Sequence, residues 1–154
     1  MRLWDWALAA YGREGVVSAC LHLQDHHGAN VPLLLAAAWA NAEDRPFDVS
    51  AAVGVTRDFE HDVIGLLRAV RRGLKSARPG FQDSARELLR GHVKAAELEA
   101  ERLLLDALEA LAGPPSQATD IGDGLSATAA AWAKAGGFLP PPSGEIKNLA
   151  RLIG

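Results

Sequence analysis

The stretch Val31-Pro-Leu-Leu-Leu-Ala-Ala-Ala-Trp-Ala-Asn-Ala42 decides the fold, because it carries no charged side chain over its whole length. Asn30 is a good helix N-cap, and Pro32 is tolerated in the first turn, so the stretch predicts a helix over 31–42. A helix that is apolar on every side must be buried on every side. We therefore expect the other helices to pack around residues 31–42.

Composition extends the helical prediction to the rest of the chain. Ala and Leu supply 29 and 22 of the 154 residues, whereas Val, Ile and Thr together supply 16, and no segment alternates with period two. We predict an all-α fold, a compact helical bundle of about five to seven helices around the buried apolar helix 31–42. The main helices are expected at 3–11, 15–27, 31–42, 57–76, 82–112 and 125–135. A short helical piece is expected near 50–55, and a short final helix from Ser143 onward.

Breakers divide the chain near its end. The run GPPSQATDIGDG at 113–124 predicts a Pro/Gly loop. We expect it to separate a helical core domain at 1–112 from a C-terminal helical extension at 125–154, which packs on the core or extends it.

Helical spacing predicts which side chains are buried. The first helix presents one face with Trp4, Leu8 and Tyr11, and the second presents Val16, Cys20 and Leu23. Two later helices have longer apolar faces, formed by Phe59, Val63, Leu66, Leu67, Val70 and Leu74, and by Leu89, Val93, Ala96, Ala100, Leu103, Ala107 and Leu111.

Charge and cysteine content limit the classes of function. A net charge of −3 gives no overall field that would draw the chain to nucleic acid or anionic lipid. The single cysteine, Cys20, excludes an internal disulfide and fits a reducing compartment. The longest uncharged run, 28–42, is too short for a membrane span. We expect a soluble cytoplasmic protein without a membrane span.

Several segments resemble a family of small uncharacterised bacterial helical proteins, a domain of unknown function. The similar segments are LWDWA at 3–7 with Tyr11, ACL at 19–21 with Leu23, Gln24 and Gly28, the helix from Leu33 to Trp39, Leu67-Arg68 with Arg71, and KAAELEAER at 94–102. The resemblance covers about the first 110 residues, departs from the family at Asn30-Val31-Pro32, and does not extend past Gly113. It implies a small helical protein and no activity or catalytic residue.

His22 and His26 are the weak metal-site candidates of the sequence. Their i, i+4 spacing can present two imidazoles to one ion. No third ligand is evident nearby, so an exposed polar face is the favoured interpretation, and we predict no metal and no cofactor.

Basic residues form a stripe on the 57–76 helix at Arg68, Arg71, Arg72 and Lys75, extended by Arg78. Such a stripe could bind phosphate or the backbone of RNA. The stripe could instead pair with acidic residues of the next helix, among them Glu97 and Glu101. We expect these two glutamates to lie on a solvated, ion-paired surface. We favour the structural pairing.

Trp6 is the strongest argument for a binding surface. Trp4 and Trp6 are two residues apart, about 200° around a helix, so both cannot face one core. Tyr11 and Trp132, on the Ala-rich helix 125–135, are further aromatic candidates for binding.

These features favour a non-enzymatic interaction module that binds an unknown protein partner or itself. The alternative is a small-molecule or phosphate-ligand binding protein, possibly an enzyme, with an aromatic pocket, and the third hypothesis is RNA or ribosome association through the stripe 68–78. The chain has no Ser-centred elbow, Gly-rich phosphate loop, Cys pair or HExxH motif. The sequence therefore leans away from catalysis and assigns no catalytic residue.

Overall fold

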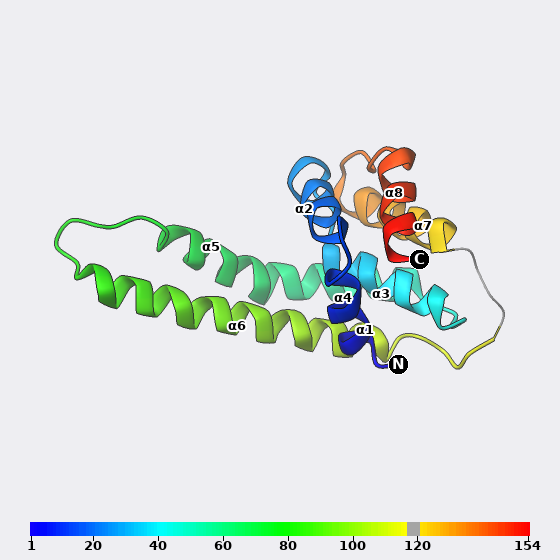
Figure 1. The fold of residues 1–154 in the computed structure, drawn as a ribbon, viewed down its shortest axis with the longest axis horizontal. Coiled ribbons are helices and arrows are strands. Elements are labelled where there is room, and N and C mark those ends of the chain that lie inside the picture. The colour runs from blue at the N-terminus through cyan, green and yellow to red at the C-terminus, as the bar shows by residue number, and fades with distance from the viewer. Residues whose placement is uncertain (117–120) are drawn as a thin grey trace. The chain divides into compact units, whose positions relative to one another are not determined.

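A computed structural model describes residues 1–116 and 121–154 (Figure 1). Residues 117–120, part of the predicted 113–124 loop, lie outside the described residues. The all-α prediction is confirmed, since the described residues form helices and one isolated bridge between Phe47 and Ala112. The elements are α1 (Leu3–Tyr11), α2 (Val16–His27), α3 (Val31–Ala42), α4 (Val49–Phe59), the π-helical η1 (Glu60–Ile64), α5 (Gly65–Gly73), α6 (Asp83–Glu109), α7 (Ile121–Gly136) and α8 (Ser143–Ile153).

The chain divides into two compact units. Unit 1 consists of Met1–Val55 and Leu105–Gly154, and unit 2 consists of Thr56–Leu104. Among the described parts of the chain, no helix is both long enough and apolar enough to cross a bilayer.

Helix α3 is the centre of unit 1, and its burial confirms the first sequence prediction. Every residue from Val31 to Ala40 is buried. The side chain of Asn30 accepts a hydrogen bond from the N–H of Leu33 at 3.0 Å, so the predicted N-cap is present. Helices α1, α2 and α7 pack against α3, and α8 packs against α2 and α7.

The predicted buried face of α1 is wrong. Leu3, Ala7 and Ala10 are buried, whereas Leu8 is exposed and Trp4 and Tyr11 are half-buried. Both sets have helical spacing, but the set with two alanines allows the α1 backbone to approach α3 closely. The larger side chains are left at the edge of the helix.

The two helices expected at 50–55 and 57–76 are one continuous run of α4, η1 and α5. In η1 the N–H of Gly65 donates to the carbonyl of Glu60, a hydrogen bond that spans five residues instead of four. A Cβ atom at position 65 would lie 2.6 Å from that carbonyl oxygen. The wide turn therefore requires glycine at this position.

Gly65→Ala is expected to lower the free energy of unfolding by about 1–3 kcal/mol, because the added methyl group forces the backbone of η1 to shift. Gly91→Ala is the matched control, since a Cβ atom there meets nothing within 4 Å. Alanine should stabilise that exposed site in α6 by up to about 1 kcal/mol. Urea denaturation measures both changes. A stabilised Gly65→Ala variant would contradict the requirement for glycine in the wide turn of η1.

Candidate functional site

Unit 2 contains two antiparallel helices, α5 and residues 83–104 of α6, which run alongside one another and are joined by residues 74–82 (Figure 1). Long charged side chains connect them. Arg68 lies 3.2 Å from Glu97, 3.5 Å from Glu60 and 3.7 Å from Glu101, and Arg71 also pairs with Glu97. Half of the basic stripe therefore makes the contacts expected of structural pairing between neighbouring helices.

Glu97 lies at the centre of this network, and its predicted solvated position is wrong. Its exposed fraction is 8%. Burial opposes its ionisation, but the hydrogen bonds and charges of Arg71 and Arg68 outweigh burial and lower the pKa of Glu97. Burial, together with the nearby charges of Glu97 and Glu60, raises the pKa of Glu101 despite the opposing charge of Arg68.

The remaining basic residues of the stripe have other positions. Arg72 and Lys75 are exposed, and neither makes an ion pair with another described residue. Arg78 donates a hydrogen bond to the carbonyl of Gly73 at 2.9 Å. The stripe 68–78 is thus divided between an internal network and a short solvent-facing basic segment.

The apolar face predicted for the 57–76 helix is not buried in unit 2. No residue of α5 is buried, and Leu66 and Val70 are 60% and 50% exposed. Arg68 and Arg71 occupy the side of α5 that faces α6, and Leu66 and Val70 point to solvent, whereas Leu67 and Leu74 are half-buried. The predicted burial is therefore wrong for Leu66 and Val70.

Apolar side chains of α5, α6 and the segment 74–82 between them meet at one groove. It has a volume of about 430 Å³, and Val70, Leu74, Phe81, Ala85 and Leu89 line it. Phe81 and Leu89 are exposed as well. Sequence reasoning missed Phe81 because it follows the breakers Pro79 and Gly80, where no helical period applies.

The aromatic candidates lie in unit 1. Trp6 and Tyr11 are half-buried on α1. Trp132 of α7 donates its indole N–H to the carbonyl of Gly28 at 2.9 Å, which connects α7 to the end of α2. Trp39 is buried in the core and donates to the carbonyl of Met1 at 2.9 Å.

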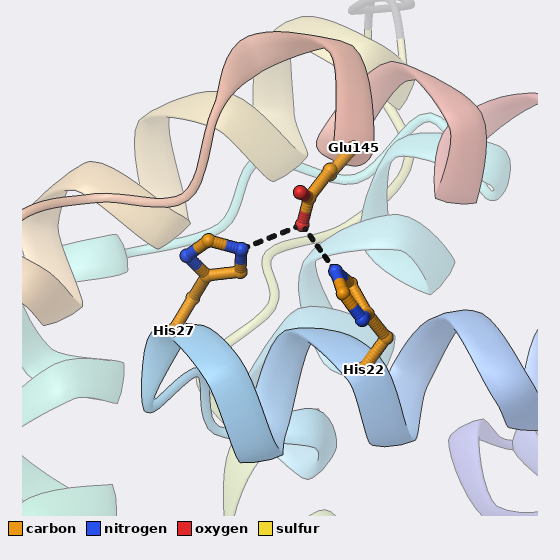
Figure 2. Close-up of side chains that lie close together, drawn as sticks. All are labelled: His22, His27 and Glu145. Carbon is orange, nitrogen blue, oxygen red and sulfur yellow. Dashed lines mark ion pairs between the residues drawn. The ribbon is translucent and has the colours of Figure 1, made fainter.

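The histidines of α2 are arranged differently from the i, i+4 pair. His22 and His26 stack with ring centroids 4.3 Å apart, but His22 and His27 are the residues that converge on Glu145 of α8 (Figure 2). The Nε2 atoms of His22 and His27 lie 3.3 and 2.8 Å from the same carboxylate oxygen, Oε2. Glu145 is far away in sequence, so no spacing rule could have found it.

Cys20 is 1% exposed, and burial raises the pKa of its thiol to about 11. A thiol held protonated in an apolar environment is a poor nucleophile.

The described residues thus form helices that carry an Arg–Glu network and an apolar groove in unit 2 and a His–Glu cluster in unit 1.

The chain belongs to the family described as protein of unknown function DUF2390, whose model matches residues 2–108. This confirms the resemblance to a domain of unknown function over about the first 110 residues. Comparisons with curated proteins and with solved structures give no match. Helices α7 and α8, and with them Glu145, lie beyond the matched residues.

Proposed function

We propose that this protein is a non-enzymatic interaction module of the cytoplasm, and that it associates with a second copy of itself through unit 2. The observation that carries the proposal is the uncovered apolar stripe of α5, which has the spacing of a core-facing helix and no buried residue. The contact surface, named here the hairpin face, consists of Leu66, Val70, Phe81, Leu89, Ala96 and Leu103.

Five members of the hairpin face lie on sides of α5 or α6, and Phe81 belongs to the segment between these helices. Leu66 and Val70 are four residues apart on α5, and Leu89, Ala96 and Leu103 recur every seven residues on α6. Val70 and Leu89 line the same groove, which joins the two stripes. All six side chains are exposed.

A second copy fits this surface better than an unrelated partner does. Two helices alone cannot enclose a core, whereas two such hairpins packed face to face make a four-helix bundle. The same patch serves both copies in a two-fold contact.

Light scattering after size exclusion tests the proposal. We expect the wild-type chain of 16.3 kDa to elute at twice that mass, and Leu89→Glu to weaken association by roughly 30-fold or more, as expected for loss of an interface residue worth about 2 kcal/mol. Leu21→Glu on α2 is the matched control, because Leu21 and Leu89 are both helical leucines that are 50% exposed. It should remain dimeric.

Three outcomes would contradict the hairpin face. One is a wild-type monomer at high micromolar concentration. Another is a dimer that survives Leu89→Glu and dissociates with Trp6→Ala, which would place the interface on α1. A monomer that heparin retains with a steep salt dependence would instead favour RNA binding through Arg72, Lys75 and Arg78.

A further inference from the structure

Two imidazoles and one carboxylate converge at the end of α2. His22 and His27 are five residues apart, about 140° around the helix, so they do not share a helix face. They reach one point because the first turn of α8 lies against the last turns of α2 and places Glu145 between them (Figure 2). One ligand atom from each of the three residues lies within 4.8 Å of the others.

The spacing of these atoms fits a metal ion. Tetrahedral zinc with bonds of about 2.0 Å separates its ligand atoms by about 3.3 Å. The Nε2 atom of His22 lies 3.3 Å from Oε2 of Glu145, and that of His27 lies 2.8 Å from it. All three ligand atoms lie within 4.8 Å of one another, so side-chain rotations can bring them to coordination distance.

A second observation concerns the carboxylate of Glu145. Its Oε2 atom is buried, and no well-aligned hydrogen bond from the described residues reaches it. The two imidazoles contact this oxygen as ion pairs, which require a protonated imidazole. A cation bound between the three side chains would satisfy this oxygen.

We propose that His22, His27 and Glu145 form a binding site for a divalent transition metal ion, with Zn²⁺ as the best fit. Two nitrogen ligands and one oxygen ligand suit Zn²⁺ and its neighbours, whereas Ca²⁺ and Mg²⁺ prefer oxygen alone. This assignment differs from the sequence prediction, which favoured no metal and paired His22 with His26.

Three protein ligands leave one coordination position of a tetrahedral ion open. His22 and Glu145 also line a groove of about 590 Å³, together with Ser18, Asn148 and Arg151. This groove brings polar and cationic side chains close to two of the three ligands, so water or a small anion from it would complete the coordination. Because Glu145 lies outside residues 2–108, the site combines the family region with the C-terminal helices of this chain.

Calorimetric titration of the full-length apoprotein with Zn²⁺ tests the site. We expect one ion per chain, and no binding of Mg²⁺ or Ca²⁺ at the same concentration. His27→Ala and Glu145→Gln should each weaken Zn²⁺ binding by more than the roughly 10- to 100-fold that loss of an outer-shell residue costs. His26→Ala is the matched control, since His26 precedes His27 in the chain and stacks on His22 but is not one of the three clustered residues. The affinity of this variant for Zn²⁺ should be unchanged.

Thermal unfolding with and without Zn²⁺ provides a second measurement that does not depend on the heat of binding. Zinc should raise the unfolding temperature of the wild type and of His26→Ala, and it should leave that of Glu145→Gln unchanged. Absorption of the Co²⁺-loaded protein should report four-coordinate geometry. The proposal is overturned if Zn²⁺ binding is absent, or if it is lost with His26→Ala and kept with both His27→Ala and Glu145→Gln.

Discussion

Trp39→Ala is expected to lower the free energy of unfolding by about 3–5 kcal/mol, the range for removing a large aromatic side chain from a packed core. Trp39 is 1% exposed in the middle of the most deeply buried helix, α3. Its replacement removes an indole that packs among neighbouring helices of unit 1, and it leaves the carbonyl of Met1 without its donor. It also removes the contact with the guanidinium of Arg45, which lies 5.5 Å from the ring centroid.

Trp6→Ala is the matched control for this prediction. The same side chain is deleted, but Trp6 is half-buried on α1, so we expect a loss of only about 1–2 kcal/mol from reduced apolar burial. Guanidinium denaturation measures both losses. It is followed by circular dichroism and not by fluorescence, because removal of a tryptophan changes the fluorescence signal itself. Equal losses for the two variants would show that Trp6 is as much a part of the core as Trp39.

Helix α3 was predictable from sequence because it carries no charged residue on any side. An N-cap at Asn30, a proline in the first turn and an uncharged run leave burial as the only stable arrangement. No choice between faces was needed. The C-terminal end of α2 was predictable for a similar local reason, since Gly28 adopts the left-handed conformation that terminates the helix, with φ of 62°.

Where a helix offers two apolar stripes, spacing does not say which one is covered. Helix α1 has the stripe of Leu3, Ala7 and Ala10 as well as the stripe of Trp4 and Leu8, and close packing selected the one with small residues. In α5 the arginines face α6 because Glu97 of α6 pairs with both of them, while Glu60 of η1 adds a contact to Arg68. Both outcomes depend on the neighbouring helix, which the local sequence does not contain.

The His–Glu cluster was not predictable for the same reason. Spacing within α2 singled out His22 and His26, and those two rings do meet, but they stack on each other at the surface. The partner of His22 at the carboxylate is His27, and Glu145 comes from α8, whose position depends on packing against α2 and α7. A single sequence contains no signal for that long-range contact.

Glu97→Gln is expected to lower the free energy of unfolding by about 2–3 kcal/mol at neutral pH. Removing one partner of a fully buried ion pair costs about 3–5 kcal/mol, because the remaining charge is left without compensation. Here Arg68 and Arg71 are partly exposed, so water screens part of that cost. Arg68 also keeps its contacts with Glu60 and Glu101.

The pH dependence of this loss follows from the direction of the pKa shift. The pKa of Glu97 is lower in the folded chain than the unfolded value of about 4.3. Its stabilising contribution is therefore complete above that unfolded value and disappears as the pH falls through the folded value. The difference between wild type and Glu97→Gln should be constant near neutral pH and shrink below about pH 4.3.

Glu101→Gln distinguishes the centre of the network from its edge. Burial raises the pKa of Glu101 in the folded chain, so its ionised form opposes folding once the pH rises above the unfolded value. Removing that charge should change stability by less than about 1 kcal/mol at neutral pH. Urea denaturation across a pH series measures both variants. Equal losses for Glu97→Gln and Glu101→Gln would mean that the two arginines are held by the carboxylates jointly, and that Glu97 is not the residue on which the pairing of α5 with α6 depends.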